Sequence, residues 1–280
     1  MKIAYLMQIR DNILQAAHII TALASYEDDV FIASYDLDAS RPLTKEFKNN
    51  PHVFFINENY EFMEGSLSIP RVWLLLLTKA VDNDKYDAYI NVNEYTLPII
   101  SREKLEEQLL KKPDYDFIQY TSEDQMPEIR KKYQKFHIGP GDPRYIKEPK
   151  FRKRMNQISN FLYLIHIRRK TIPFKLFYGP CWFILSHATA TKLTTNIAEC
   201  SNYFNLAIFS QEVYFQSAIH KYSDHIINNC VVLLDSKWHP NFFANFVKLE
   251  NIPTDTTKFF ANKVQRIDNP ELFDKFIELY

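Results

Sequence analysis

Glycine and cysteine are both scarce in this chain, which has 4 Gly and 3 Cys among 280 residues. No Gly-x-Gly-x-x-Gly or Walker pattern is present, which argues against a glycine-rich loop that cradles phosphates. The cysteines are odd in number and lack the spacing of metal ligands, so we expect them to take small packing roles in a reducing compartment. They are Cys181, Cys200 and Cys230.

Long apolar runs are missing as well. The longest beyond the N-terminus, Val72 to Leu77, is far shorter than the roughly 20 residues that span a bilayer. The apolar run that starts at Lys2 is broken at Gln8 and Arg10, which makes it too short for a signal peptide. These features predict a cytoplasmic protein.

Charge is balanced overall but not along the chain. The formal net charge is zero, yet residues 130–175 carry fourteen Lys and Arg residues against Asp142 and Glu148. This segment is either a solvated face or a contact for an anionic partner, such as an acidic acceptor or the anionic surface of a membrane. No recognition motif for nucleic acid accompanies the charge, so we do not expect a nucleic-acid partner.

Short apolar strands alternate with helices through the first half of the chain. Each strand is a nearly continuous apolar run, which predicts an α/β fold with Rossmann-like wiring, a mostly parallel central sheet and helices on both faces. No repeat or linker is visible, so the simplest interpretation is one domain over residues 1–280. The predicted strands are 2–9, 30–35, 53–56, 86–92, 117–120 and 178–186, and the predicted helices are 13–23, 71–81, 101–110 with Ser101 as N-cap, and 152–169.

Ligands of such sheets bind beyond the carboxyl ends of the strands. Those ends carry polar residues from Gln8 to Asn12, at Asp36, and from Asn91 to Pro98. For Glu94 the simpler expectation is an exposed loop acid, although it can also contact a ligand. The candidate ligand contacts at the strand ends are therefore Gln8, Arg10, Asp36, Asn93 and Glu94.

The stretch from Tyr178 to Ile219 contains a candidate catalytic carboxylate, Glu212, at the start of a predicted helix. A helix N-terminus favours the ionised form while apolar walls disfavour it, so the pKa of Glu212 can be tuned toward the working pH of a general base. The alternative is that Glu212 only caps the helix or interacts with its dipole.

Five pieces in the same order resemble the core-2/I-branching N-acetylglucosaminyltransferase family, which also includes the peptide O-xylosyltransferases. The order of the pieces and the Phe-Ala-Asn-Lys sequence are the specific part of the resemblance, which spans nearly the whole chain. Trp238-His239-Pro240 also follows the family pattern. The five pieces are Lys2 to Leu6, Ile90 to Ile99, Gly179 to Phe183, Gln211 to Phe215, and Phe259 to Lys263.

This resemblance implies a GT-A fold and an inverting enzyme that takes a sugar, with N-acetylglucosamine as the first expectation, from a UDP donor. Glu212 matches the carboxylate that deprotonates the acceptor hydroxyl, and Lys263 matches a basic residue that holds the donor diphosphate in place of a metal ion. Trp238 matches an aromatic residue that packs on the acceptor sugar, and Trp182 is a second candidate for that contact. Asp36 falls at the strand end that meets the nucleoside. No cofactor is implied.

The resemblance, combined with the predicted cytoplasmic location and the basic segment, leads to expectations about partners and about the roles of the two halves of the chain. Residues 1–125 would form the half that binds the nucleotide sugar, and residues 126–280 the acceptor and catalytic half. The acceptor would be a glycan or a lipid-linked oligosaccharide in cell-surface polysaccharide synthesis. The basic residues 130–175 would then rest on the inner face of the cell membrane.

The sequence departs from the family pattern at four places. Asn93 to Thr96 lacks the glycine and the aspartate of the strand-end motif, Pro180 replaces a serine, and Gln211 replaces the aspartate before the catalytic glutamate. A second basic residue for the diphosphate has no clear match. Its candidates are Lys237, Lys248 and Lys258.

These departures leave two alternatives open. One is a metal-dependent GT-A transferase with another donor, in which Asp36 or Glu94 holds the metal; Asp36-Leu37-Asp38 has the form of an Asp-x-Asp motif. The other is a non-catalytic protein of the same fold that binds a glycan or a nucleotide.

Overall fold

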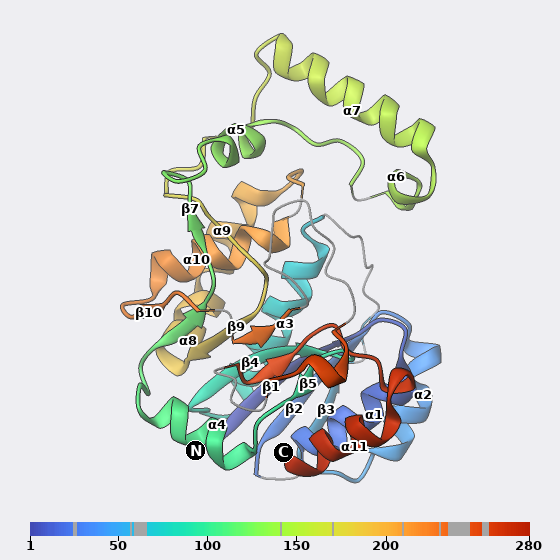
Figure 1. Cartoon of the computed structure of the whole chain (residues 1–280). Coiled ribbons are helices and arrows are strands. Elements are labelled where there is room, and N and C mark those ends of the chain that lie inside the picture. The colour runs from blue at the N-terminus through green and yellow to red at the C-terminus, as the bar shows by residue number, and fades with distance from the viewer. Residues whose placement is uncertain are drawn as a thin grey trace.

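The computed structural model describes the chain except for residues 25–26, 57, 59–65, 141, 170, 209, 230, 235–246 and 254–257 (Figure 1). In the described part, the central sheet has seven strands in the order β10-β6-β9-β4-β1-β2-β3. All neighbouring strands are parallel except β9, which runs antiparallel to β4 and β6. The predicted α/β fold with a mostly parallel sheet is therefore confirmed. The strands are β1 Ile3–Ile9, β2 Asp29–Ser34, β3 Val53–Ile56, β4 Ala88–Asn93, β6 Asp116–Ile118, β9 Phe183–Ser186 and β10 Ile226–Ile227.

Helices cover both faces of this sheet (Figure 1). One face packs against α1 Ile13–Leu23, α4 Arg102–Leu110 and α11 Pro270–Leu279. The other packs against α3 Ser68–Asn83, α8 His187–Thr195, α9 Ile197–Phe204 and α10 Tyr214–Tyr222. A further helix, α2 Leu37–Glu46, follows β2 and packs against α1.

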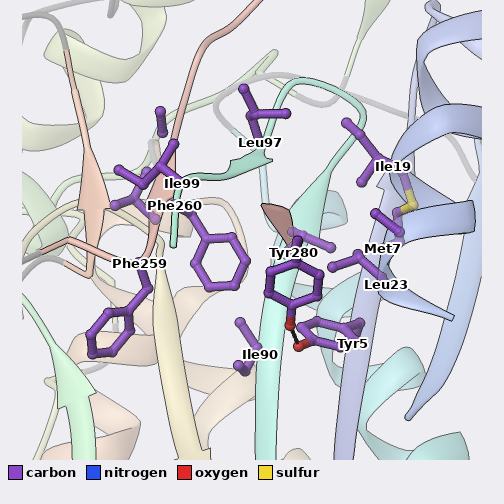
Figure 2. Packing of buried hydrophobic residues seen from close by; sticks show 14 of the residues in the cluster. Tyr5, Met7, Ile19, Leu23, Ile90, Leu97, Ile99, Phe259, Phe260 and Tyr280 are labelled. Atoms are coloured by element: carbon purple, nitrogen blue, oxygen red, sulfur yellow. Dashed lines mark hydrogen bonds between the residues drawn. The ribbon is translucent and has the colours of Figure 1, made fainter. Parts of the chain in front are cut away.

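Strand β1 shows why the core divides into two clusters. Successive side chains of a strand point to opposite faces of the sheet. Tyr5 and Met7 belong to the cluster beneath α1 and α11, whereas Ala4 and Leu6 belong to the cluster beneath α3. In the first cluster the Tyr5 and Tyr280 hydroxyls are hydrogen-bonded, which ties the last turn of the chain to the first strand (Figure 2).

Two of the sequence predictions differ from the structure. Helix α2 was not predicted, because Pro42 lies inside it and interrupts the expected pattern. The predicted strand 178–186 is not continuous: β8 Phe177–Tyr178 ends before Gly179, and β9 begins only at Phe183. Hydrogen bonds to the 3-10 helix η1 (Ser210–Glu212) and to α10, which are not part of the sheet, stabilise this break. The Gly179 N–H donates to the Glu212 carbonyl at 2.9 Å, and Gln216 Nε2 donates to the Pro180 carbonyl at 2.5 Å.

At Gly179, two backbone segments approach each other so closely that no side chain fits between them. A Cβ at this position would lie 2.1 Å from the carbonyl oxygen of Gln119. The neighbouring strands β7 Thr121–Ser122 and β8 form a small antiparallel pair beside this contact. Only glycine permits this approach, which sets the course of the chain from Gly179 to Trp182.

A three-stranded sheet joins distant parts of the chain. Its order is β11-β12-β5, with β5 Leu97–Pro98, β11 Val232–Leu233 and β12 Phe260–Ala261. Strand β12 runs antiparallel to β5. This pairing brings the residues after β12 against the loop between β4 and β5. The short 3-10 helices are η1 Ser210–Glu212, η2 Leu249–Asn251 and η3 Arg266–Asp268.

The basic segment forms three helices, α5 Glu128–Gln134, α6 Pro143–Lys147 and α7 Pro149–Leu164. Helix α7 confirms the helix predicted in this region. Figure 1 shows α6 and α7 standing apart from the central sheet at one end of the molecule. Across the residues that the structure describes, no helix is long and apolar enough to cross a bilayer.

Candidate functional site

A cavity of about 510 Å³ lies beyond the carboxyl ends of β1 and β4. Its walls come from seven parts of the chain that are far apart in sequence. Six of the candidate residues line it together, namely Gln8, Arg10, Asn93, Glu94, Trp182 and Lys263. The other lining residues are Asp11, Tyr35, Ile69, Trp73, Tyr95, Cys181, Gln211, Asn262 and Gln265.

The loop from Asn93 to Thr96 is a tight turn locked by the segment after β12. Asn93 Oδ1 accepts hydrogen bonds from the Tyr95 N–H at 2.9 Å and from the Thr96 hydroxyl at 2.9 Å. Asn262 Nδ2 donates to the same oxygen at 2.8 Å and to Thr96 Oγ1 at 3.0 Å. These bonds hold the turn although it lacks the glycine of the family pattern. The side-chain oxygen of Asn93 is therefore fully used in holding this turn of the cavity wall.

Gln15 of α1 completes this connection. Its buried Nε2 donates to the carbonyls of Glu94 at 2.6 Å and Val264 at 2.9 Å. Its Oε1 accepts the Arg266 N–H at 2.8 Å. One side chain therefore fixes the β4–β5 loop and the segment containing Lys263 relative to each other. Sequence reasoning missed Gln15, and the available signal was a polar residue four positions before Ile19, on the buried side of the helix.

Glu94 is not the exposed loop acid that the sequence suggested. It is only 2% exposed, because the turn after β1 closes over it. Its Oε1 accepts the N–H groups of Arg10 at 2.8 Å and Asp11 at 3.2 Å. Burial raises the pKa of Glu94 to about 7, and the two donated hydrogen bonds oppose that rise. Glu94 thus holds the segment that carries Arg10.

Two basic side chains, Arg10 and Lys263, line the same cavity. Two of the three candidates for a second diphosphate contact, Lys248 and Lys258, do not line it. Lys258 donates to Asn229 Oδ1 at 2.9 Å, and Lys248 is exposed outside the lining. Lys237 lies outside the described residues. Arg10 is therefore the second basic residue that the fold brings to this cavity.

Glu212 ends the 3-10 helix η1 and stands just before α10 rather than inside its first turn. The Tyr178 hydroxyl donates to Glu212 Oε2, and Lys132 of α5 attracts the carboxylate. Burial raises the pKa of Glu212 to about 7, and the Tyr178 hydrogen bond and Lys132 oppose the rise. Glu212 does not line the cavity, but the preceding residue, Gln211, does.

Trp182 lines the cavity at 7% exposure. Asn91 of β4 holds its segment, since Asn91 Nδ2 donates to the Cys181 carbonyl at 2.8 Å and Asn91 Oδ1 accepts the Phe183 N–H at 2.7 Å. The ring is therefore a fixed wall of the same cavity as Lys263. The other candidate aromatic residue, Trp238, lies outside the described residues.

Two buried polar atoms in this wall have no protein partner. Among the residues that the structure describes, Trp73 Nε1 and Gln211 Oε1 make no hydrogen bond, and both residues line the cavity. Their elements, α3 and η1, pack against each other. A buried polar group without a partner costs about 1–3 kcal/mol, so these two atoms are candidates for contact with a ligand.

Asp36 lies beside a neighbouring cavity of about 650 Å³. Its side chain accepts the Ala39 N–H at 2.9 Å and so caps α2. Tyr35 lines both cavities, and its hydroxyl donates to Gln8 Oε1 at 2.6 Å between them. The two cavities are therefore adjacent, with the Tyr35 side chain in the wall of each.

The acids of the Asp-x-Asp sequence do not converge. Asp36 caps α2, while Asp38 is exposed and pairs with Arg41 at 2.7 Å. Within the described ranges, no three His, Cys, Asp or Glu side chains gather as metal ligands do. Among the described residues, Asp11 and Glu94 are the two carboxylates that line the cavity with Arg10 and Lys263.

Comparison with known proteins gives one informative match. The family model of the Core-2/I-Branching enzymes matches residues 3–254. A search of curated proteins found no match. One solved structure that resembles the chain is the bifunctional IspDF from Campylobacter jejuni, at 9% identity and a TM-score of 0.34, covering 82% of this chain and 50% of that one. The chain thus spans half the length of that protein, and a likeness of this size assigns no activity.

Proposed function

The chain belongs to the core-2/I-branching enzyme family of glycosyltransferases, and we propose that it moves N-acetylglucosamine from a UDP donor to a glycan hydroxyl with inversion at the anomeric carbon. The observation that carries this proposal is the shared cavity, which places Arg10 and Lys263 together while Glu212 adjoins it through Gln211. Fixed cations and a carboxylate of raised pKa are the groups that such a transfer requires.

The two adjacent cavities suit a nucleotide sugar. The nucleoside would occupy the cavity beside Asp36, and the diphosphate would pass Tyr35 to reach Arg10 and Lys263. Two basic side chains held by the fold can neutralise the charge that develops on the leaving diphosphate. This arrangement supports a transfer that needs no divalent metal.

The unpartnered atoms support an acetamido sugar. An acetamido group presents a carbonyl that accepts a hydrogen bond and an N–H that donates one. The Trp73 indole N–H and Gln211 Oε1 are the complementary donor and acceptor. Ile69, also in the cavity wall, offers apolar surface for the methyl group.

The reaction then proceeds in one displacement. Glu212 takes the proton of the acceptor hydroxyl as its oxygen bonds to the anomeric carbon. The bond between that carbon and the diphosphate oxygen breaks, and UDP leaves with the electron pair. Lys263 and Arg10 stabilise UDP, and Glu212 ends protonated. In this proposal residues 1–125 supply most of the donor site, residues 126–280 supply the base, and the acceptor is a glycan, in particular a lipid-linked oligosaccharide.

The test is UDP release from a panel of UDP-sugars, with acceptor glycans and EDTA present. We expect turnover of UDP-N-acetylglucosamine that survives EDTA. Abolition by EDTA would favour the metal-dependent alternative with Asp36 or Glu94. Binding of nucleotide or glycan without turnover of any donor and acceptor pair would favour the non-catalytic alternative.

Donor selection has its own prediction. Trp73→Phe keeps an aromatic ring but removes the indole N–H, so we expect the preference for UDP-N-acetylglucosamine over UDP-glucose in kcat/KM to fall about tenfold. Trp182→Phe is the matched control. It makes the same exchange of tryptophan for phenylalanine in the same wall without removing an unpartnered donor, so the preference between the two donors should not change. An unchanged preference in Trp73→Phe would exclude the acetamido contact.

The pH dependence follows from Glu212. A general base must be ionised, and the pKa of Glu212 is about 7, so we expect kcat/KM to fall about tenfold per pH unit below 7 and to level off above it. Tyr178 and Lys132 both lower this pKa. Tyr178→Phe should therefore move the acid limb to higher pH. Glu94→Gln tests the other carboxyl of similar pKa, and loss of the limb in that variant would assign it to Glu94.

A further inference from the structure

Helix α7 exposes large apolar side chains at its C-terminal end. Phe161 is 60% exposed and Leu164 is 74% exposed, and Ile165 and Ile167 of the following turn are also exposed. The opposite side of the helix leans on the preceding segment, where Ser159 Oγ accepts the Ile138 N–H at 3.1 Å. The apolar end therefore points away from the contact that fixes the helix.

The N-terminal half of α7 is basic on the same side. Residues spaced three or four apart lie on one face of a helix. Lys150, Arg154, Ile158, Phe161 and Ile165 follow this spacing, so one ridge passes from basic to apolar along the helix. Helix α7 contains no Asp or Glu, and Lys150, Arg152, Lys153 and Arg154 are all exposed.

We propose that this ridge docks on an anionic lipid membrane, with the apolar end of α7 entering the interface and the basic half resting on the head groups. A helix with one apolar side, flanked by Lys and Arg and without acids, has the composition of helices that lie in the interface. The positive charge selects anionic lipid, and the exposed Phe161, Leu164 and Ile165 supply the insertion that charge alone does not.

Helix α7 stands at the same end of the molecule as the cavity of about 510 Å³ that contains Arg10 and Lys263, which is called the donor cavity from here on. Ile69, in the first turn of α3, lines the donor cavity. Ser68 and Arg71 of that turn line a smaller cavity together with His137 and Gly139, on the segment that leads to α7. Docking would hold the donor cavity close to the membrane plane, where a lipid-linked acceptor resides. This last step rests on the proposed function, whereas the docking does not.

The experiment is co-sedimentation of the full chain with vesicles of phosphatidylcholine, with and without phosphatidylglycerol, in the absence of any donor. We expect binding to the anionic vesicles only, weakened by high salt. Phe161→Ser with Leu164→Ser, and separately Lys150→Gln with Arg154→Gln, should each weaken it at least tenfold. Leu14→Ser with Ile267→Ser is the matched control, since it removes two apolar residues elsewhere that are even more exposed and should leave binding unchanged.

Three results would overturn the proposal. The first is that the wild type does not bind anionic vesicles at low salt. The second is that both α7 variants bind these vesicles as strongly as the wild type does. The third is that the wild type is a dimer in solution and that the variant Phe161→Ser with Leu164→Ser is a monomer. Failure here leaves sugar transfer intact, because the vesicle assay contains no donor. If no UDP-sugar of the panel is turned over, the vesicle result still stands, because vesicle binding is measured without any sugar transfer.

Discussion

Glu212→Gln is expected to reduce kcat about 1000-fold, with little change in the KM for the UDP donor. The amide keeps the size of the side chain and can still accept from the Tyr178 hydroxyl, but it cannot take the proton of the acceptor. Removing a general base typically costs 10²- to 10⁴-fold in rate. The measurement is UDP release at saturating donor and acceptor, at a pH above 7, where the wild-type carboxyl is ionised.

Glu250→Gln is the control for this variant. Glu250 is exposed and accepts a hydrogen bond from Asn269 at 2.8 Å, far along the chain from η1. The same exchange of carboxylate for amide should leave the rate unchanged there. If Glu212→Gln keeps a third or more of the wild-type kcat while remaining folded, Glu212 is not the base.

Lys263→Met is expected to lower kcat/KM about 100- to 1000-fold, which is the usual effect of losing a group that stabilises developing charge. Methionine retains much of the aliphatic length of lysine but brings no charge to the diphosphate. Because Lys263 and Arg10 line one cavity, Arg10→Met should act on the same step, with a smaller effect since its side chain is more exposed.

Lys258→Met and Lys248→Met separate this role from a general loss of positive charge. Neither lysine lines the donor cavity, so both variants should keep wild-type kcat/KM. Addition of a divalent metal provides a second discriminator. If Mn²⁺ restores Lys263→Met and EDTA inactivates the wild type, then a metal ion rather than the lysine neutralises the diphosphate.

Much of the fold was visible in the sequence because periodicity and local signals agree there. The helix at 13–23 has the bounds predicted from its apolar spacing, and Ser101 caps α4 as expected, accepting the Lys104 N–H at 3.3 Å. The errors arise where tertiary contacts override local pattern. Helix α2 forms although Pro42, a residue that usually interrupts a helix, lies inside it. The run from Tyr178 to Ser186 has the pattern of one strand, but the close approach of Gly179 to Gln119 breaks it.

The site was harder to predict, because its walls meet only through long-range pairing. Arg10 and Lys263 lie at opposite ends of the sequence, and no local signal shows that one cavity contains both. The burial of Glu94 depends on N–H groups more than eighty residues earlier. Trp73 was not singled out, and Gln211 was noted only as a departure from the family pattern, since a polar atom is recognised as unpartnered only when its whole surroundings are known.

The pairing of β12 with β5 also bears on how the protein is made. A ribosome that has reached residue 250 has delivered all seven strands of the central sheet but neither β12 nor Lys263. The donor cavity is therefore among the last features to form, since it depends on contacts between the two ends of the chain. A nascent chain can therefore contain all seven strands of its sheet before the segment with Lys263 is made, so the proposed donor site forms only after that segment is added.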